Sequence, residues 1–234
     1  MASAVVLVHS PLVGPGTWRN LAAALDSLRL QVIVPDLRCA MQAEPPLYPR
    51  LIETVLAEMA GLDANGDLVL VGHSGAGALL PSIVAAESRI RIAIFMDAVL
   101  PHPGQCWFDT APAGLSGHIR SLVCDGHLPR WDKWWPPGSV RALLKDEDLG
   151  AAFEAELGPL PLAYFEERAP DTEMPDSARC AYLQLSPACR IEADHAMHNG
   201  WAVARLDLHH LAMLTHADIV AGSLAELAGK VQRA

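Results

Sequence analysis

The strongest constraint on the fold of this chain is a regular alternation of strand and helix signals over roughly its first 100 residues. A continuous apolar run at residues 4–8, a run at residues 68–72 and a run at residues 90–96 that only Arg91 interrupts resemble strands that are buried on both faces of a parallel sheet. Between these runs, apolar residues recur at helical spacing, as in residues 18–28 and 51–59. Strands that alternate with helices predict a parallel sheet covered by helices on both faces.

The same alternation returns near the end of the chain. Two further strands are predicted at residues 182–185 and 203–208, each followed by a helical segment. With a shorter run at residues 31–34, six strands are predicted in total, and the sequence has no internal repeat. We therefore expect one α/β domain, formed by residues 1–100 and 179–234 around a mostly parallel six-stranded sheet.

Residues 101–178 interrupt this pattern. Proline and glycine are frequent there, and the segment contains four of the six tryptophans, at positions 107, 131, 134 and 135. Short helices are predicted at residues 140–144 and 149–157. One interpretation is an irregular excursion packed by its own aromatic side chains. We favour a helical cap over a pocket, because insertions into α/β sheets usually lie beside the carboxyl ends of the strands, where ligands bind.

Composition argues against several classes of partner. The chain has 17 Lys and Arg against 27 Asp and Glu, a formal net charge of −10, so neither nucleic acid nor an anionic membrane is an expected partner. The longest uncharged run, residues 68–86, contains His73 and Pro81, which indicates a buried strand and helix and not a membrane span. The first basic residue is Arg19, and the apolar run at residues 4–8 is too short for the core of a signal peptide, so we expect a cytoplasmic protein. A small molecule is the expected partner, and the sequence leaves a monomer or a homodimer open.

The most specific local signal is Val69-Leu70-Val71-Gly72-His73-Ser74-Gly75-Ala76-Gly77. A strand enters, a turn of small residues carries a serine, and a helix leaves, which is the context of a nucleophile elbow. The N–H groups that follow Ser74 lie at a helix N-terminus, where the partial positive charge favours an oxyanion. The segment departs from G-x-S-x-G in having Ala76 at the last position, although Gly77 follows. The alternative is an ordinary glycine-rich turn between a strand and a helix.

Three stretches together resemble the α/β-hydrolases, and in particular the compact six-stranded group that includes plant methylesterases and hydroxynitrile lyases. They are residues 6–11 through Trp18, the elbow at Ser74, and Asp207-Leu208-His209-His210-Leu211-Ala212-Met213-Leu214. The resemblance implies the α/β-hydrolase fold over nearly the whole chain, although residues 101–178 match in position only.

The resemblance also implies which histidine is the catalytic base. In this family the base immediately precedes a segment like Leu211-Ala212-Met213-Leu214, which indicates His210 and not His209.

The triad acid is where the chain departs from the family. Many members have an aspartate in the loop after the strand that corresponds to residues 182–185, but this loop reads Ser186-Pro187-Ala188-Cys189. In haloalkane dehalogenases the acid instead follows the strand after the elbow helix, where this chain has Asp97. A carboxylate at the end of an apolar strand needs a polar partner, and a catalytic imidazole is such a partner. We interpret Asp97 as the acid; the alternative is that it only caps a loop.

The expected oxyanion hole contains an anomaly. In the family one donor is the N–H of the residue after the nucleophile, here Gly75, and the second comes from a position that is Pro11 here. Proline has no N–H. Three alternatives follow: the Ser10 hydroxyl donates, a later N–H such as that of Val13 or Gly14 donates, or the reaction forms no full oxyanion. Hydroxynitrile lyases have a substrate-contacting hydroxyl residue at the position of Ser10, so we expect Ser10 in the pocket.

These residues predict a serine hydrolase that cleaves an ester, thioester or lactone of a small hydrophobic molecule. Pro11 motivates one alternative, a lyase or cyclase in which His210 moves protons while Ser74 and Ser10 orient the substrate. The missing acid after residues 182–185 motivates another, a ligand-binding protein with a degenerate triad. Neither a zinc motif nor the spacing of a dinucleotide motif is present, so no metal or cofactor is predicted.

Overall fold

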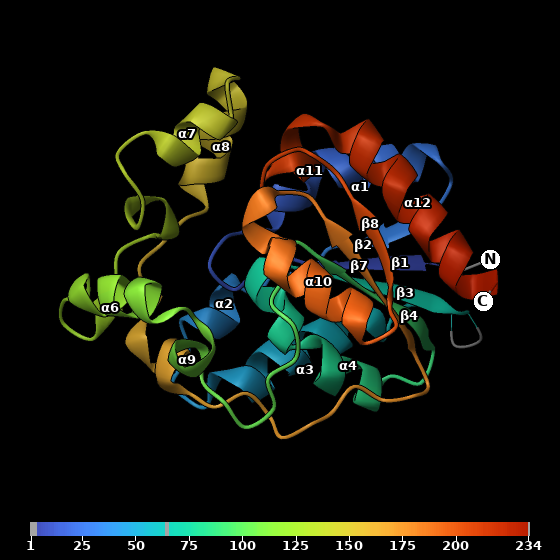
Figure 1. The fold of residues 1–234 in the computed structure, drawn as a ribbon, viewed down its shortest axis with the longest axis horizontal. Helices are drawn as coiled ribbons and strands as arrows, with labels where there is room; N and C mark the ends of the chain where they lie inside the picture. The colour runs from blue at the N-terminus through green and yellow to red at the C-terminus, as the bar shows by residue number, and fades with distance from the viewer. Residues whose placement is uncertain (1–3, 64–65, 234) are drawn as a thin grey trace.

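The computed structural model describes residues 4–63 and 66–233 of the chain. Its centre is a six-stranded sheet with the order β2-β1-β3-β4-β7-β8, in which every neighbouring pair is parallel (Figure 1). The strands are β1 (Ala4–Val8), β2 (Gln31–Ile33), β3 (Leu68–His73), β4 (Ile90–Met96), β7 (Arg179–Gln184) and β8 (Ala202–Arg205). The predicted six-stranded parallel sheet is confirmed.

Helices cover both faces of this sheet (Figure 1). One face carries α1 (Arg19–Ser27), α11 (Ala212–Thr215) and α12 (Ala217–Arg233), and the other carries α2 (Arg38–Met41), α3 (Leu47–Met59), α4 (Leu80–Ala86) and α10 (Arg190–His198). Side chains alternate along each strand, so that in β1 Val5 and Leu7 pack on the first face while Val6 and Val8 pack on the second. Burial on both faces explains why the strands are continuous apolar runs in the sequence.

The uncharged run at residues 68–86 forms β3, the elbow and α4. The single helix expected after Ser74 is divided into a 3₁₀ helix, η2 (Ser74–Ala78), and α4, because Pro81 has no N–H and is suited to the first turn of a new helix. In the part of the chain that the structure describes, no helix has the length and apolarity that a membrane crossing needs.

Most of residues 101–178, in green to yellow in Figure 1, lie at the carboxyl ends of the strands, and the last of them return to the opposite end of the sheet, where β7 begins. Residues 101–178 form the helices α5 (Trp107–Thr110), α6 (Ala113–Ser121), α7 (Ser139–Leu143), α8 (Glu147–Ala155) and α9 (Leu162–Glu166), and the 3₁₀ helix η3 (Trp131–Lys133). The two short helices predicted at residues 140–144 and 149–157 correspond to α7 and α8, whereas α5, α6, α9 and η3 were not predicted. An antiparallel pair of two-residue strands, β5 (His127–Leu128) and β6 (Leu160–Pro161), was not predicted either. We call residues 101–178 the cap segment below.

Two carboxylates of the cap segment bind backbone N–H groups of the core. Glu156 Oε2 accepts a hydrogen bond from the N–H of Gly16 at 2.7 Å. Glu167 accepts from the N–H groups of Leu47 and Tyr48 at 2.6 and 2.9 Å, at the start of α3. These contacts fix both α8 and α9 against the sheet domain, close to the carboxyl ends of its strands.

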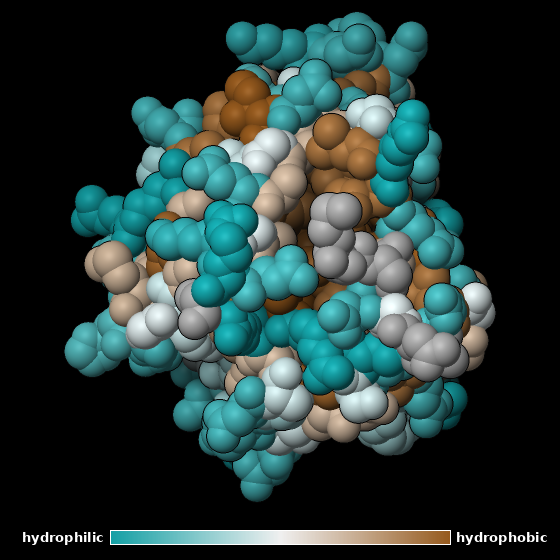
Figure 2. Space-filling model, turned by 90° about the vertical axis from the view of Figure 1, so that its right-hand side faces the viewer, coloured by the Kyte–Doolittle hydropathy of each residue, from teal (hydrophilic) through white to brown (hydrophobic). Residues whose placement is uncertain are grey.

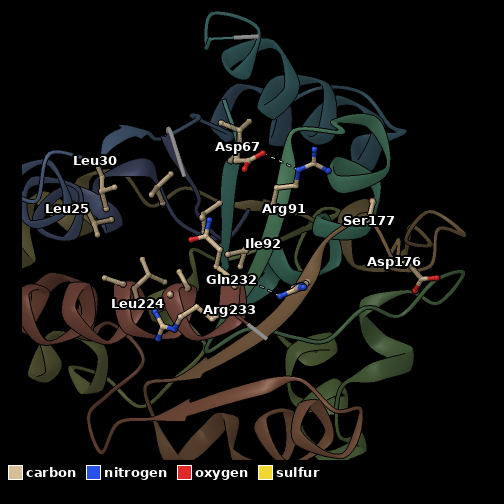
Figure 3. A pocket seen from close by; sticks show the side chains of 17 residues that line it. Leu25, Leu30, Asp67, Arg91, Ile92, Asp176, Ser177, Leu224, Gln232 and Arg233 are labelled. Carbon is tan, nitrogen blue, oxygen red and sulfur yellow. Dashed lines mark hydrogen bonds and ion pairs between the residues drawn. The ribbon is translucent and has the colours of Figure 1, made fainter. Parts of the chain in front are cut away.

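The opposite end of the sheet has a pocket of about 550 Å³. Its lining includes Val5, Leu68 and Ile92 near the starts of three strands, and Arg233 at the end of α12. Figure 2 shows apolar side chains around a hollow on this face. In the close-up of Figure 3, Arg91 points toward Asp67, with Nε and Oδ1 3.1 Å apart. This pocket is therefore separate from the strand ends that carry the predicted site residues.

Candidate active site

Ser74 directly follows β3 and lies at the sharp turn that the sequence predicts. Its backbone adopts a left-handed φ of +55°, and its carbonyl accepts a hydrogen bond from the N–H of Val99 at 3.1 Å. A Cβ added at Gly77 would lie 2.0 Å from the carbonyl oxygen of Val99, so only glycine permits this close approach. The methyl group of Ala76, by contrast, is buried in the core. The glycine that the turn requires is therefore Gly77, one residue later than in the G-x-S-x-G pattern.

Asp97 directly follows β4 and is 1% exposed. Its Oδ2 accepts hydrogen bonds from Nδ1 of His210 at 2.8 Å and from the hydroxyl of Ser186 at 2.6 Å. Its Oδ1 accepts from the N–H groups of Leu185 and Ser186 at 2.8 and 3.0 Å. Four donors thus surround one buried carboxylate, which satisfies its hydrogen-bonding capacity.

These contacts determine the charge of Asp97 and the tautomer of His210. Burial by itself would raise the pKa of Asp97, but the hydrogen bonds from His210 and Ser186 outweigh it and lower that pKa to about 2. The carboxylate is therefore ionised, and it holds the proton of the neutral imidazole on Nδ1 of His210. Nε2 is then the nitrogen that can accept a proton.

His73 and Trp131 flank the ring of His210. The ring centroids of His73 and His210 are 4.5 Å apart, and Nε2 of His73 donates to the carbonyl of His210 at 3.0 Å. Burial keeps the pKa of His73 well below its ordinary value, so this ring is neutral and positions His210. The ring of Trp131, from the cap segment, lies 6.1 Å from that of His210.

The structure places His210 beside the elbow, but the hydrogen bond between His210 and the hydroxyl of Ser74 is not formed. The hydroxyl of Ser74 has no hydrogen bond to any residue in the ranges 4–63 and 66–233. Ser74 is half-buried and the side chain of His210 is 22% exposed, so both are accessible to a substrate. Contacts between a nucleophile and its base are often long in an unliganded enzyme and tighten in the substrate complex.

Ser10 and Pro11 adjoin Gly75, as expected. A Cβ built at Gly75 would lie 3.1 Å from Oγ of Ser10 and 3.6 Å from Cδ of Pro11. Oγ of Ser10 accepts a hydrogen bond from the N–H of Leu12 at 3.3 Å, which leaves its own proton available to donate. The N–H of Val13 is already bound to the carbonyl of Ser10 at 3.1 Å. Between Ser10 and Val13, this geometry therefore favours Ser10 as the second donor.

Comparison with known proteins identifies the family. The sequence profile of the alpha/beta hydrolase family matches residues 5–223. The chain belongs to the alpha/beta hydrolase family. The predicted resemblance is thereby confirmed, although no curated protein matches this α/β-hydrolase in sequence.

Solved structures show the same fold. A pyrethroid hydrolase from Sphingobium faniae is 18% identical, with a TM-score of 0.75 and complete coverage (100%) of both chains. An extracellular alpha/beta-hydrolase from a Paenibacillus species is 18% identical, with a TM-score of 0.74, and the match covers 96% of this chain and 98% of that one. A mutant of tomato methylketone synthase I is 19% identical, with a TM-score of 0.73, and the match covers 99% of each chain.

One group of side chains in this α/β-hydrolase has the composition of a metal site. Among the described residues, only Asp97, Cys189 and His210 bring three such ligand atoms within 4.8 Å of one another. Burial raises the pKa of the Cys189 thiol, which stays protonated and donates to the backbone carbonyl of Asp97 at 3.4 Å. A metal would need a thiolate and would displace the hydrogen bond between Asp97 and His210. These residues therefore fit a hydrogen-bonded pair better than a metal centre.

Sequence reasoning missed the contribution of Ser186. In the sequence, the loop from Ser186 to Cys189 differs from that of many family members in lacking a carboxylate, and this difference does not reveal the role of its serine. Because β4 and β7 are adjacent parallel strands, the residues after them meet at one edge of the sheet. A hydroxyl residue directly after β7 was the available signal for a partner of Asp97.

Proposed function

We propose that this α/β-hydrolase is a cofactor-free serine hydrolase that uses Ser74, His210 and Asp97 to cleave an ester, thioester or lactone of a small hydrophobic molecule. The observation that carries the proposal is the 2.8 Å hydrogen bond between Nδ1 of His210 and the buried carboxylate of Asp97, beside a strained serine turn. This arrangement leaves Nε2 as the base and supplies a fixed negative charge for the imidazolium.

The reaction follows from this geometry in two halves. Nε2 of His210 takes the proton of Ser74 as Oγ attacks the carbonyl carbon, and the N–H of Gly75 and the hydroxyl of Ser10 donate to the oxyanion. The imidazolium then protonates the leaving group, which gives an acyl-enzyme on Ser74. Water, deprotonated by His210, releases the acid and restores the serine.

The preference for a hydrophobic substrate rests on the cap segment. Trp131 lies beside His210, and its ring also contacts those of Trp135 and Phe153. A substrate group that moves out of water and packs against these rings gains binding free energy, because its apolar surface is buried. Structural neighbours that carry the names pyrethroid hydrolase and polyneuridine aldehyde esterase accord with such chemistry.

Hydrolysis of 4-nitrophenyl esters tests this proposal. We expect the wild type to release 4-nitrophenol from the acetate and butyrate, and Ser74→Ala to lower kcat/KM by on the order of 10³-fold or more. Ser27→Ala, which removes an exposed hydroxyl bound only to the carbonyl of Ala24, is the matched control. Retention of full activity by Ser74→Ala would refute the proposal.

A lyase or cyclase is the second candidate, because Pro11 cannot supply the usual N–H donor. A methylketone synthase among the structural neighbours shows that the fold is also found in a protein not named as an esterase. This candidate predicts turnover with Ser74 unacylated. The third alternative, a binding protein with a degenerate triad, loses its motivation because Asp97 lies within hydrogen-bond distance of His210. The cytoplasmic location and the homodimer stay predictions.

A further inference from the structure

We propose that Tyr164, a residue of the cap segment, is a further catalytic residue whose hydroxyl donates to the reaction's oxyanion beside the Ser10 hydroxyl and the Gly75 N–H. The two side-chain hydroxyls would replace the backbone N–H that Pro11 cannot supply. This inference rests on the proposed function and assigns to its oxyanion hole a donor that comes from outside the sheet domain.

The first observation is what surrounds the missing side chain of Gly75. A Cβ built there would meet Oγ of Ser10 at 3.1 Å, Cδ of Pro11 at 3.6 Å and the hydroxyl oxygen of Tyr164 at 3.6 Å. Two hydroxyl groups from different parts of the chain therefore converge on the residue that follows the nucleophile. Any larger residue at position 75 would occupy the space between them.

The second observation is that Tyr164 is held rigidly. It is 1% exposed, its ring stacks on that of Tyr48 with centroids 5.6 Å apart, and it meets Phe165 edge to face at 5.2 Å. Glu167, one helical turn after Tyr164, binds the N–H groups of Leu47 and Tyr48. A donor fixed in this way needs little rearrangement when charge develops, which is what makes an oxyanion hole effective.

The third observation concerns the proton. Burial raises the pKa of Tyr164 well above its ordinary value, and burial also raises the pKa of Tyr48. Both hydroxyls are therefore neutral, so the hydroxyl of Tyr164 carries a proton that it can donate. Because Tyr164 is buried, a hydrogen bond from its hydroxyl to the oxyanion is stronger than the same bond in water.

Tyr164→Phe tests the inference because it keeps the ring and removes only the hydroxyl. We expect kcat for 4-nitrophenyl acetate to fall about 10²-fold, with KM changed less than about twofold. Ser10→Ala should act in the same direction. Tyr182→Phe is the matched control, since it removes another buried phenol hydroxyl, one that donates to the carbonyl of Ala98 at 2.8 Å.

A second readout separates oxyanion binding from a loss of packing. Sulfur accepts hydrogen bonds weakly, so a thionoester gains less from the donors than the matching ester. The ratio of kcat/KM for ester and thionoester should fall at least about tenfold in Tyr164→Phe and in Gly75→Ala, whose Cβ would crowd Ser10 at 3.1 Å. Tyr182→Phe should keep the wild-type ratio.

The outcomes distinguish the two levels of the proposal. A wild type that needs Ser74, together with a Tyr164→Phe variant that retains kcat and the ester-to-thionoester ratio, overturns this inference and leaves the proposed function intact. A wild type whose ester hydrolysis Ser74→Ala does not change overturns the proposed function and this inference together. A fall in both kcat and the ratio in Tyr164→Phe, but not in Tyr182→Phe, supports the inference.

Discussion

The carboxylate of Asp97 shows how single residues share the construction of the site. Three of its four hydrogen-bond donors come from Leu185 and Ser186, in the loop where many relatives are expected to carry the acid itself. The loop after β7 therefore holds a carboxylate that another strand supplies. Ser186 does not touch a substrate in this account, so we regard it as a positioning residue.

Ser186→Ala should lower kcat about tenfold and leave KM within about twofold, because Oδ2 of Asp97 loses one donor and holds His210 less firmly. The free energy of unfolding should fall by about 1–2 kcal/mol. Ser186→Thr keeps the hydroxyl and should restore most of kcat. Steady-state kinetics and urea unfolding measure both effects. An unchanged kcat in Ser186→Ala would show that the backbone donors position Asp97 without it.

Among the helices and strands, those of the sheet were predictable, and so were α7 and α8 of the cap segment, but the strand pairing in the cap segment was not. The runs at residues 4–8 and 90–96 coincide with β1 and β4, because burial on both faces leaves an apolar signature, which in β4 only the exposed Arg91 interrupts. The position of Asp97 at the end of a strand could be predicted as well, since this residue directly follows such a run. The strands β5 and β6 contain two residues each, and no periodicity can reveal a pairing that depends on tertiary contacts.

The convergence of distant side chains also lies beyond the sequence. Tyr164 is separated from Gly75 by most of the cap segment, and Ser186 from Asp97 by 89 positions. No spacing pattern in the sequence indicates that the two residues of either pair lie close together. Family resemblance indicated His210, which the residues alone could not separate from the other nine of the ten histidines.

Glu156 should hold the cap segment against the core. It accepts the N–H of Gly16, and a Cβ at Gly16 would lie 2.6 Å from its Oε1. Glu156→Ala should raise the rate of limited proteolysis within residues 101–178 about tenfold, because a hydrogen bond to a charged group stabilises the closed state. Gly16→Ala should have a similar effect by displacing the carboxylate.

The control for this prediction is Glu154→Ala, which removes a nearby carboxylate with ion pairs of 3.9 Å to Arg130 and Arg141. Such partly exposed pairs contribute little to stability. Equal cleavage rates for Glu156→Ala and the wild type would show that Glu156 does not hold the cap segment against the core.

For the whole molecule, buried neutral histidines predict how stability depends on pH. His9 is fully buried; its Nδ1 donates to the carbonyl of Ser10 at 2.8 Å, and its Nε2 accepts from the N–H of Leu37 at 3.0 Å. Burial lowers the pKa of His9 to about 4. The unfolded chain binds a proton near the ordinary pKa of 6.5, so the fold loses stability as the pH falls from that value toward 4.

His9 alone should lower the free energy of unfolding by about 2 kcal/mol between pH 6.5 and pH 5, at about 1.4 kcal/mol per pH unit. His9→Gln removes this titration and should give a shallower dependence, although its stability at pH 7 should also be lower. Urea unfolding at pH 7, 6 and 5 measures the slope. Identical slopes in the two proteins would contradict the assignment of a neutral His9.

The most direct test of the proposed chemistry is covalent labelling with a fluorophosphonate, which reacts with an activated serine. We expect one adduct per chain on the peptide that contains Ser74, none in Ser74→Ala, and labelling slowed by on the order of 10³-fold in Asp97→Asn. An enzyme that turns over esters while Ser74 stays unlabelled, or an Asp97→Asn variant labelled as fast as the wild type, would contradict a Ser74-His210-Asp97 triad.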